Sequence, residues 1–570
     1  MESPFNAVTP LEPDELKLSR RTKISVPRSL RHRAPVLWLL LPFMAGLIVA
    51  RTISPLPSPL WLLTVALIAV IGAAILAAKR PHAWAISVCL ALTFTGAAYY
   101  ELRRARLSVW NELPPREARL TLEIERTFAP SPDGKRVSGL ARVVQADTHL
   151  NELTGQYLYF SLARRAGEEA PIRSAKIATI GVLQTLPRAP PLNTFEGYLA
   201  NTGVNFRLNR GRVINPVSKP TAYRQFCANT QQQLADFLSL SLEKHPDLAA
   251  ISRAMLLGLQ QELNEEQNQL FMRSGTMHLF SVSGLHIAVI ALALEGVLGL
   301  LRLPRLPRFL VAATLLWLYV DITGTAPSAV RAYLMVVLLQ VSFVLRLPVN
   351  PVATLGLAAL GALLIDPMQL FSASFQMSYG IVAALLLLGL PLGDFWTERW
   401  QLFRLLPKAT WTWWQHGLAW AQRGLLSVLA IGLATALVST ISGVIYFQLF
   451  TPGSLVANLV LIPAGSLVIL SGFISMLCGL AGLGWLCATF NHASALVLLL
   501  SERGIDYFLK VPGVFLPARF PTTWFGFATL GMLLAALFWG YATRWEKRFG
   551  GIWPPFVIVA LALIFGVRFG

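Results

Sequence analysis

The apolar positions of this chain gather into long runs, and one extended polar stretch separates the third run from the fourth. A run of about 18 or more apolar residues is long enough for a helix to cross a hydrocarbon core about 30 Å thick. The pattern therefore predicts a polytopic α-helical membrane protein with about 11 to 13 transmembrane helices. The runs cover residues 35–52, 57–78, 82–100, 277–301, 307–322, 327–345, 350–365, 371–391, 424–447, 454–480, 484–500, 523–541 and 552–568.

Within the polar stretch, apolar and polar residues alternate with a period of two, which is the pattern of half-buried strands. Five short strands in about 100 residues, separated by turn signals, predict a small β-barrel of the OB type, although other small β folds fit nearly as well. The expected strands are 118–128, 136–145, 156–164, 176–186 and 203–214. Residues 222–273 show apolar stripes at helical spacing, so amphipathic helices are expected there, on the membrane surface or against the barrel.

These patterns divide the chain into five parts. The segment 394–422 combines several Trp residues with spaced cations, which is typical of a helix in the membrane interface. The expected parts are a cytoplasmic tail at 1–34, three transmembrane helices at 35–101, an extracytoplasmic OB-like domain at 102–219, amphipathic helices at 220–274, and a second transmembrane domain at 275–570 that includes the interfacial helix 394–422.

Composition excludes an ordinary soluble protein, because 55% of the residues are hydrophobic, only 14% are charged and the mean hydropathy is +0.56. The net charge of +19 permits a nucleic-acid partner. Its placement, however, is what the positive-inside rule expects of cytoplasmic loops, which puts the N-terminus inside the cell and the β domain outside. Four cysteines without CxxC spacing indicate neither a zinc site nor a disulfide framework.

Polar residues interrupt four of the expected spans, and buried polar groups in a membrane usually mark a functional route. Arg331 is the costliest of them, and it must snorkel to the surface, meet water, or pair with Asp321 or Asp366. Helix packing by small residues beside interfacial histidines is an alternative explanation of the first site. Glycines and serines predict a broken start for that span, and Pro463 predicts an interruption of a later one. The candidate path residues are His278, Ser281, Ser283, Gly284, His286, Arg331, Asp366, Gln376, Asn458 and Pro463.

The expected barrel carries cations beside aromatic residues, a combination that binds single-stranded nucleic acid through phosphate attraction and base stacking. The alternative is that the aromatic residues form the barrel core and that nearby acids dilute the charge. The candidate DNA-binding residues are Lys135, Arg136, Arg142, Tyr157, Tyr159, Arg164, Arg165, Arg207, Arg210 and Arg212.

Signatures of enzymes and cofactors are weak in this sequence. It has no GxxxxGK[ST] loop for a nucleotide, no HExxH and no dense His/Asp cluster for a metal pair, so we expect no cofactor and no metal site. Ser283 and His286 lie three residues apart and could form a nucleophile–base couple, but no acid is obviously placed to orient the histidine.

Several motifs together resemble the ComEC competence family, the membrane channel of bacterial DNA uptake. GTMHLFSVSGLHIAVI (275–290) is similar to the central signature of that family, and NTFEGYLANTGV (193–204) is similar to the end of its extracytoplasmic domain. Further blocks that resemble the family are TGTAPSAVRAYLM (323–335), DPMQLFSASFQMSYG (366–380) and ANLVLIP (457–463).

The resemblance implies a polytopic channel in the bacterial cell membrane that passes one DNA strand into the cytoplasm, with an OB-like domain outside. It implies that the polar start of 275–290 lines or gates the route, that Gly284 allows close approach, and that Arg331 faces phosphate. The partners it implies are single-stranded DNA, membrane lipid, an external DNA receptor, a cytoplasmic motor or strand-binding protein, and other copies of the chain.

The chain departs from the family in one respect. Many members carry a C-terminal metallo-β-lactamase-like domain, whereas this sequence has no HxHxDH motif and stops close to its last apolar run. We therefore expect no nuclease activity from this chain and a separate nuclease as a partner. Two alternatives remain open: a membrane enzyme that acts on lipid or cell-wall glycan through Ser283 and His286, and a transporter of another anionic polymer.

Overall fold

The computed structural model describes most of the chain, and the cytoplasmic tail expected at 1–34 lies almost wholly outside the described residues. Two candidate site residues, Ser281 and Arg165, also lie outside them. The described residues are 34–53, 57–77, 80–104, 107, 110, 114–128, 134–164, 170–187, 190–191, 194–280, 282–347, 350–407, 410–543 and 552–569.

A closed five-stranded barrel forms the smaller part of the structure, as the alternating pattern predicts. The strand order is β1-β2-β3-β5-β4, with β3 and β5 parallel and the other neighbours antiparallel. Alternate residues point inward, and Leu122, Phe160 and Leu208 are fully buried in the barrel core. The strands are β1 Arg116–Thr127, β2 Arg136–Ala146, β3 Tyr157–Ala163, β4 Lys176–Thr185 and β5 Phe206–Ser218.

A helical bundle forms the larger part, and the polytopic architecture predicted from the apolar runs is confirmed. Among the described residues, nine helices are long and apolar enough to cross a membrane, and three apolar helices are shorter. The helices that correspond to the runs are α2 Leu37–Thr52, α3 Pro59–Leu76, α4 Pro81–Arg104, α9 Gly284–Leu300, α10 Arg305–Ile322, α11 Pro327–Val344, α12 Pro351–Ile365, α13 Ala373–Ala384, α14 Leu390–Arg399, α15 Trp413–Phe447, α16 Ser454–Leu480, α17 Gly484–Leu509, α18 Thr523–Ala542 and α19 Pro554–Leu561.

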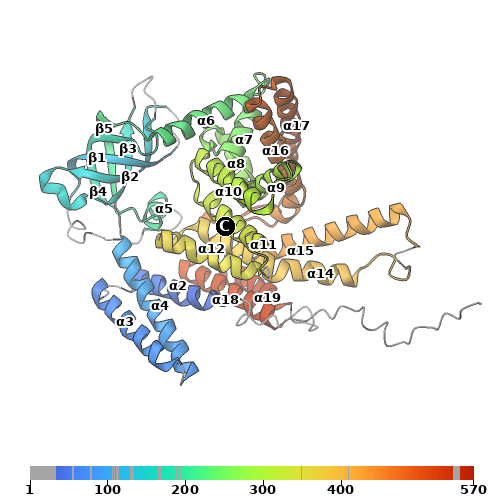
Figure 1. The fold of residues 1–570 in the computed structure, drawn as a ribbon, viewed down its shortest axis with the longest axis horizontal. Helices are drawn as coiled ribbons and strands as arrows, with labels where there is room; N and C mark the ends of the chain where they lie inside the picture. The colour runs from blue at the N-terminus through green and yellow to red at the C-terminus, as the bar shows by residue number, and fades with distance from the viewer. Residues whose placement is uncertain are drawn as a thin grey trace, which may run out of the picture.

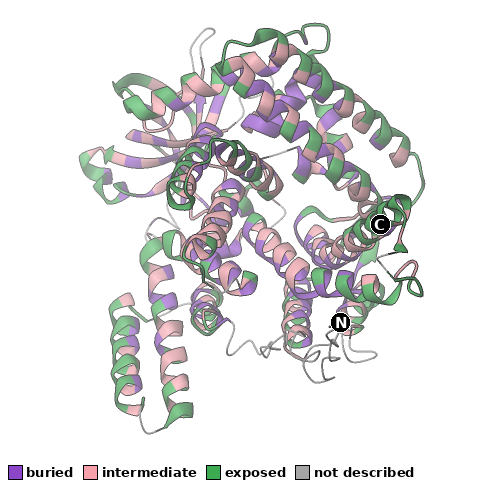
Figure 2. Ribbon diagram, turned by 45° about the vertical axis from the view of Figure 1, so that its right-hand side comes forward, coloured by how far each residue is buried: buried purple, intermediate pink, exposed green. Residues whose placement is uncertain are grey.

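The bundle has two hydrophobic cores that meet along α11. One core draws on α2, α12, α13, α15, α18 and α19, and the other on α9, α10, α16 and α17. Ala329 and Ala332 of α11 belong to the second core, whereas Leu334 and Leu338 pack against the first. Buried residues line the inner sides of the barrel and of the bundle (Figure 2). Helix α11 therefore lies at the seam between the two halves.

The amphipathic helices expected at 220–274 pack against the helical bundle. These helices, α6 Ala222–Ser239, α7 Pro246–Leu257 and α8 Glu265–Arg273, pack against the bundle, with α6 and α7 both in contact with α16 and α17. Nine of the twelve residues of α7 are buried. The expected contact with the barrel is therefore wrong for α7, because its apolar residues surround the helix and pack into the second core, and a location at the membrane surface stays a prediction.

The predicted interfacial helix 394–422 is not a separate element. Helix α14 ends at Arg399 and α15 starts at Trp413, and the two protrude from the bundle as a hairpin (Figure 1). Thr412 and Gln415 form a capping box that starts α15, and no proline interrupts it before Phe447. The exposed Trp413 and Trp420 still suit a membrane interface, so the location of this segment stays a prediction.

A small three-stranded sheet, which we did not expect from the sequence, joins distant parts of the bundle. Its strands are β6 Leu449–Phe450, β7 Leu516–Arg519 and β8 Arg568–Phe569, in the order β6-β7-β8. Strands of two to four residues give too little alternation to be read from a sequence.

Candidate functional site

The start of α9 is built around a capping interaction between Ser283 and His286. Ser283 is the N-cap residue, and its backbone N–H donates to Nδ1 of His286 at 3.2 Å. The Ser283 hydroxyl lies 2.9 Å from the same nitrogen. Because Nδ1 accepts a hydrogen bond, the proton of the neutral imidazole is assigned to Nε2. That Nε2 is buried and has no hydrogen-bond partner among the residues that the structure describes.

The span that begins at 277 has the predicted broken start. A short 3₁₀ turn, Met277–Leu279, precedes α9, so His278 and His286 do not share a continuous helix. His278 is exposed, whereas His286 is fully buried. Gly284 is exposed, and a Cβ there would meet only the Cβ of Ala332 at 3.8 Å, an ordinary contact. The role of Gly284 in allowing close approach therefore stays a prediction.

Arg331 lies one turn into α11 and is only 1% exposed. Its Nη2 donates to both the carbonyl oxygen and the hydroxyl of Ser374 on α13, at 2.8 and 2.6 Å. Its Nε and Nη1 are buried and have no hydrogen-bond partner in the described ranges. The side chain therefore neither snorkels to the surface nor leaves the seam between the two halves.

The carboxylates predicted as partners of Arg331 lie elsewhere, so that prediction is wrong. Asp321 accepts hydrogen bonds from Tyr223 and Arg224, and Asp366 accepts one from the backbone N–H of Met368 at 3.2 Å. Short carboxylates at the ends of α10 and α12 bond to groups beside those ends, which leaves neither for Arg331.

Gln376 joins α13 to α15. Its Nε2 donates to the carbonyl of Leu370 at 3.0 Å, and its Oε1 accepts from the hydroxyl of Tyr446 at 2.8 Å. Two hydroxyls on the same pair of helices, those of Tyr379 and Ser442, are buried and find no partner in the part of the chain that the structure describes. The structure thus adds Ser374, Tyr379 and Tyr446 to the residues predicted from sequence.

Asn458 and Pro463 lie on α16 in different surroundings. Oδ1 of Asn458 is buried, and no described residue donates a hydrogen bond to it. Leu455 lies 3.0 Å from the position that a Cβ on Gly432 would occupy, so α16 begins beside the middle of α15. Pro463 is exposed inside an unbroken α16, so the predicted interruption there is wrong.

Several of these side chains place polar atoms in the bundle interior that have no hydrogen-bond partner in the described part of the chain. His286, Arg331, Tyr379, Ser442 and Asn458 supply such atoms from α9, α11, α13, α15 and α16. An unsatisfied buried polar atom costs about 1–3 kcal/mol, so ordered water or a ligand normally satisfies it. Each of these atoms is therefore a position at which water or a ligand would supply the missing hydrogen bond.

The candidate DNA-binding residues of the barrel fall into two groups. The first group consists of side chains that bond to other side chains. Arg142 donates to the hydroxyl of Tyr157, which donates to Glu125, and Arg207 pairs with Glu196 at 2.7 Å. Burial and the bond to Glu125 raise the pKa of Tyr157. The bond to Tyr157 raises the pKa of Arg142.

The remaining barrel candidates contact aromatic rings or face outward. Tyr159 packs against Phe128 and Phe195. Arg210 and Arg212 line a surface hollow of about 410 Å³ together with Glu117. Lys135 and Arg136 are exposed and Arg164 is half-buried at the paired ends of β2 and β3. A role for these residues in DNA binding stays a prediction.

No metal centre is apparent, since no group of three or more His, Cys, Asp or Glu side chains in the described ranges could hold a metal ion.

Comparisons with known proteins locate the chain within a family. A family described as "Competence protein" matches residues 255–543, which begin in α7 and end after α18. ComE operon protein 3 of Bacillus subtilis (strain 168) is 27% identical over 174 residues, which are 30% of this chain and 22% of that protein. The match thus spans less than a quarter of the relative's length. No solved structure matches the chain significantly.

Proposed function

Since this chain belongs to the competence protein family, we propose that it acts in DNA uptake and passes a single strand of DNA through its helical bundle. The coarser part of the proposal, a role in DNA uptake, also draws on the similarity to ComE operon protein 3. The finer part, passage of one strand, rests on the interior of the bundle.

The observation that carries the proposal is the burial of Arg331. A lone guanidinium inside a membrane bundle is expensive, and it is retained where it meets water, a counter-ion or a charged cargo. Arg331 has one nitrogen held by Ser374 and two nitrogens without a partner among the described residues, in the seam between the two hydrophobic cores. A phosphodiester or its hydration water would satisfy those donors.

The apolar helices favour a location in the cell membrane. The cations between the expected spans favour a cytoplasmic N-terminus and an extracytoplasmic barrel. In that orientation an arriving strand meets the barrel first and the bundle second. We expect an external DNA receptor, a cytoplasmic motor or strand-binding protein and a separate nuclease as partners, and self-association is compatible with the proposal.

The geometry of Ser283 and His286 weighs against the enzyme alternative. In a Ser–His nucleophile couple, a third group orients the second ring nitrogen of the histidine. Here Nδ1 accepts from the backbone N–H of Ser283, and Nε2 has no partner among the described residues. The pair is therefore explained as a helix cap. A transporter of another anionic polymer would use the same cation, Arg331. Only the identity of the transported polymer distinguishes this alternative from the proposed function.

The test is uptake of labelled DNA into a nuclease-protected state, in a strain that lacks the gene and carries it back as variants. We expect Arg331→Gln to reduce uptake at least about tenfold, because one hydrogen bond to a charged group is worth about 1.5–3 kcal/mol. Arg331→Lys should retain part of the activity. The matched control is Arg305→Gln, which changes an exposed arginine at the start of α10. Normal uptake in the deletion strain would refute the proposed function.

A further inference from the structure

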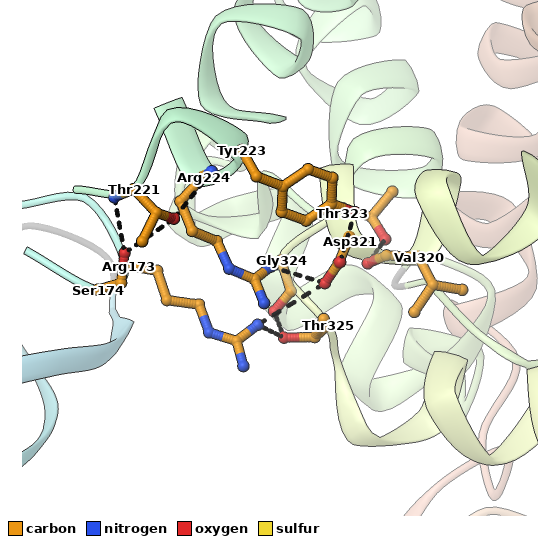
Figure 3. A network of polar contacts seen from close by, with 10 residues as sticks. All are labelled: Arg173, Ser174, Thr221, Tyr223, Arg224, Val320, Asp321, Thr323, Gly324 and Thr325. Carbon is orange, nitrogen blue, oxygen red and sulfur yellow. Dashed lines mark hydrogen bonds and ion pairs between the residues drawn. The ribbon is translucent and has the colours of Figure 1, made fainter. Parts of the chain in front are cut away.

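A compact charged cluster lies where the barrel meets the bundle (Figure 3). Its centre is the carboxylate of Asp321 at the end of α10, whose side chain is only 3% exposed. Arg224 Nη1 donates to Oδ1 of Asp321 at 2.8 Å, and the Tyr223 hydroxyl donates to Oδ2 at 2.7 Å. Arg173 Nη1 lies 3.9 Å from the same Oδ1 and donates to the hydroxyl of Thr325 at 2.6 Å.

Three separate segments meet in this cluster, which we call the junction cluster (Arg173, Tyr223, Arg224, Asp321 and Thr325). Arg173 precedes β4 of the barrel, Arg224 lies in the first turn of α6, and Thr325 belongs to the turn between α10 and α11. A second link joins the same parts, because Ser174 Oγ accepts a hydrogen bond from the backbone N–H of Thr221. Thr325 of the junction cluster lies two residues before the start of α11 and six residues before Arg331.

The charges of the junction cluster do not balance. Two guanidinium groups face one carboxylate, which leaves one positive charge. The negative charge of Glu125 also attracts Arg173, but this carboxylate already forms an ion pair with Arg142 and accepts a hydrogen bond from Tyr157. Burial and the neighbouring charge of Arg224 lower the pKa of Arg173, while Asp321 and Glu125 oppose that shift. An arginine keeps its proton under such shifts, so the excess positive charge is permanent at physiological pH.

Both arginines still reach solvent. The side chain of Arg173 is 38% exposed and that of Arg224 is 23% exposed, whereas the carboxylate that holds them is buried. Arg224 also lies in the first turn of the 18-residue α6, where the partial positive charge of the helix N-terminus adds to the local field. The cluster thus offers two guanidinium groups in fixed positions. One of their two positive charges is not balanced by a carboxylate.

We propose that Arg173 and Arg224 bind a phosphodiester group of the DNA strand as it passes from the barrel to the bundle. The proposal rests on the proposed function for the identity of the strand. One phosphodiester carries one negative charge, which equals the charge left over in the cluster. Planar guanidinium forks are well suited to phosphate oxygens, and Asp321 holds both forks in place before the ligand arrives.

The experiment measures binding of a fluorescent oligothymidylate to the full chain in phosphatidylcholine nanodiscs over a range of salt concentrations. Each lost phosphate contact should reduce the slope of log K against log salt by about 0.7 for a single strand. We expect Arg173→Gln to reduce the slope by about that amount and to weaken binding about tenfold. The double variant with Arg224→Gln should weaken binding further without a second decrement in the slope, because both arginines contact one phosphodiester. Arg173→Lys keeps the charge and should restore the slope.

The matched control is Lys244→Gln, an exposed cation beyond the far end of α6, about 27 Å along the helix from its start. It should leave slope and affinity unchanged. Thermal unfolding of each variant checks the fold, and the charge-retaining Arg173→Lys variant remains informative if the glutamine variants unfold.

Three outcomes would overturn the inference. An unchanged slope in the double variant would mean that the junction cluster only holds the barrel and the bundle together. The proposed function would still stand if a strain that carries this double variant took up DNA. The site would be assigned to lipid headgroups if the glutamine variants left the oligothymidylate slope unchanged but weakened binding of the chain to phosphatidylglycerol in nanodiscs. Failure of the wild type to bind the oligonucleotide would overturn the inference directly, whereas failure of the proposed function is read independently from normal uptake in the deletion strain.

Discussion

Arg331 on α11 donates two hydrogen bonds to Ser374 on α13, and these bonds join the two hydrophobic halves of the bundle through a buried charge. The serine supplies two neutral acceptors and no counter-charge. The guanidinium is therefore positioned but not neutralised, which is the state expected of a cation that serves a passing anion.

Stability and function should respond in opposite directions to the loss of this charge. Replacing a buried ionic group by an apolar residue of similar volume is often neutral or stabilising by about 1–4 kcal/mol. We expect Arg331→Met to unfold at the same or a higher temperature in detergent while DNA uptake is lost. A clearly lower unfolding temperature would instead assign Arg331 a structural role.

The hydrogen bond between Tyr446 and Gln376 should contribute measurably to the contact between α15 and α13. Tyr446→Phe leaves Oε1 of Gln376 without its donor, which should cost about 1–3 kcal/mol. Gln376→Leu alone and the double variant complete a double-mutant cycle, measured by thermal unfolding. A coupling energy near zero would show that the two side chains act independently.

Ser283 should behave as a helix cap. Ser283→Ala removes the cap hydroxyl and should destabilise the start of α9 by about 1 kcal/mol, with uptake reduced only slightly. Ser283→Asn, which offers a different capping group, should recover most of that stability. Complete loss of activity in Ser283→Ala with unchanged unfolding would support a nucleophilic serine and the enzyme alternative.

Asp321 should stabilise the joint between barrel and bundle. Asp321→Asn weakens two hydrogen bonds and leaves Arg173 and Arg224 without their carboxylate, so we expect a loss of about 2 kcal/mol. Limited proteolysis between barrel and bundle, together with thermal unfolding, measures the effect. Asp366→Asn is the comparison, because Asp366 accepts a single backbone bond and should cost less.

Alkaline pH should weaken the barrel through Tyr157. Its pKa is raised in the folded state, so the neutral phenol contributes stability below the unfolded value of about 10 and loses it as pH rises through the folded value. We expect the wild type to lose stability relative to Tyr157→Phe above about pH 10, because the variant has no phenol to titrate. Parallel unfolding curves between pH 8 and 11 would contradict this.

Local patterns were sufficient for the elements themselves. Apolar runs identified the membrane helices and period-two alternation identified the barrel strands, because both signals arise from neighbours along one segment. The same local view failed for α7, for the uninterrupted α15 and for Pro463, where packing against distant helices or the continuity of a helix decided the outcome. The β6-β7-β8 sheet gave too short a signal to be seen.

The sequence by itself determined the composition of the candidate site, because charged and amide residues inside apolar runs are conspicuous wherever those runs pack. It could not determine their partners. Arg331 bonds to Ser374, 43 residues away, and Asp321 bonds to Arg224, 97 residues away. Only the tertiary structure decided these pairings, because the energy of a buried polar group depends on which helices surround it, and no period along the chain records that arrangement.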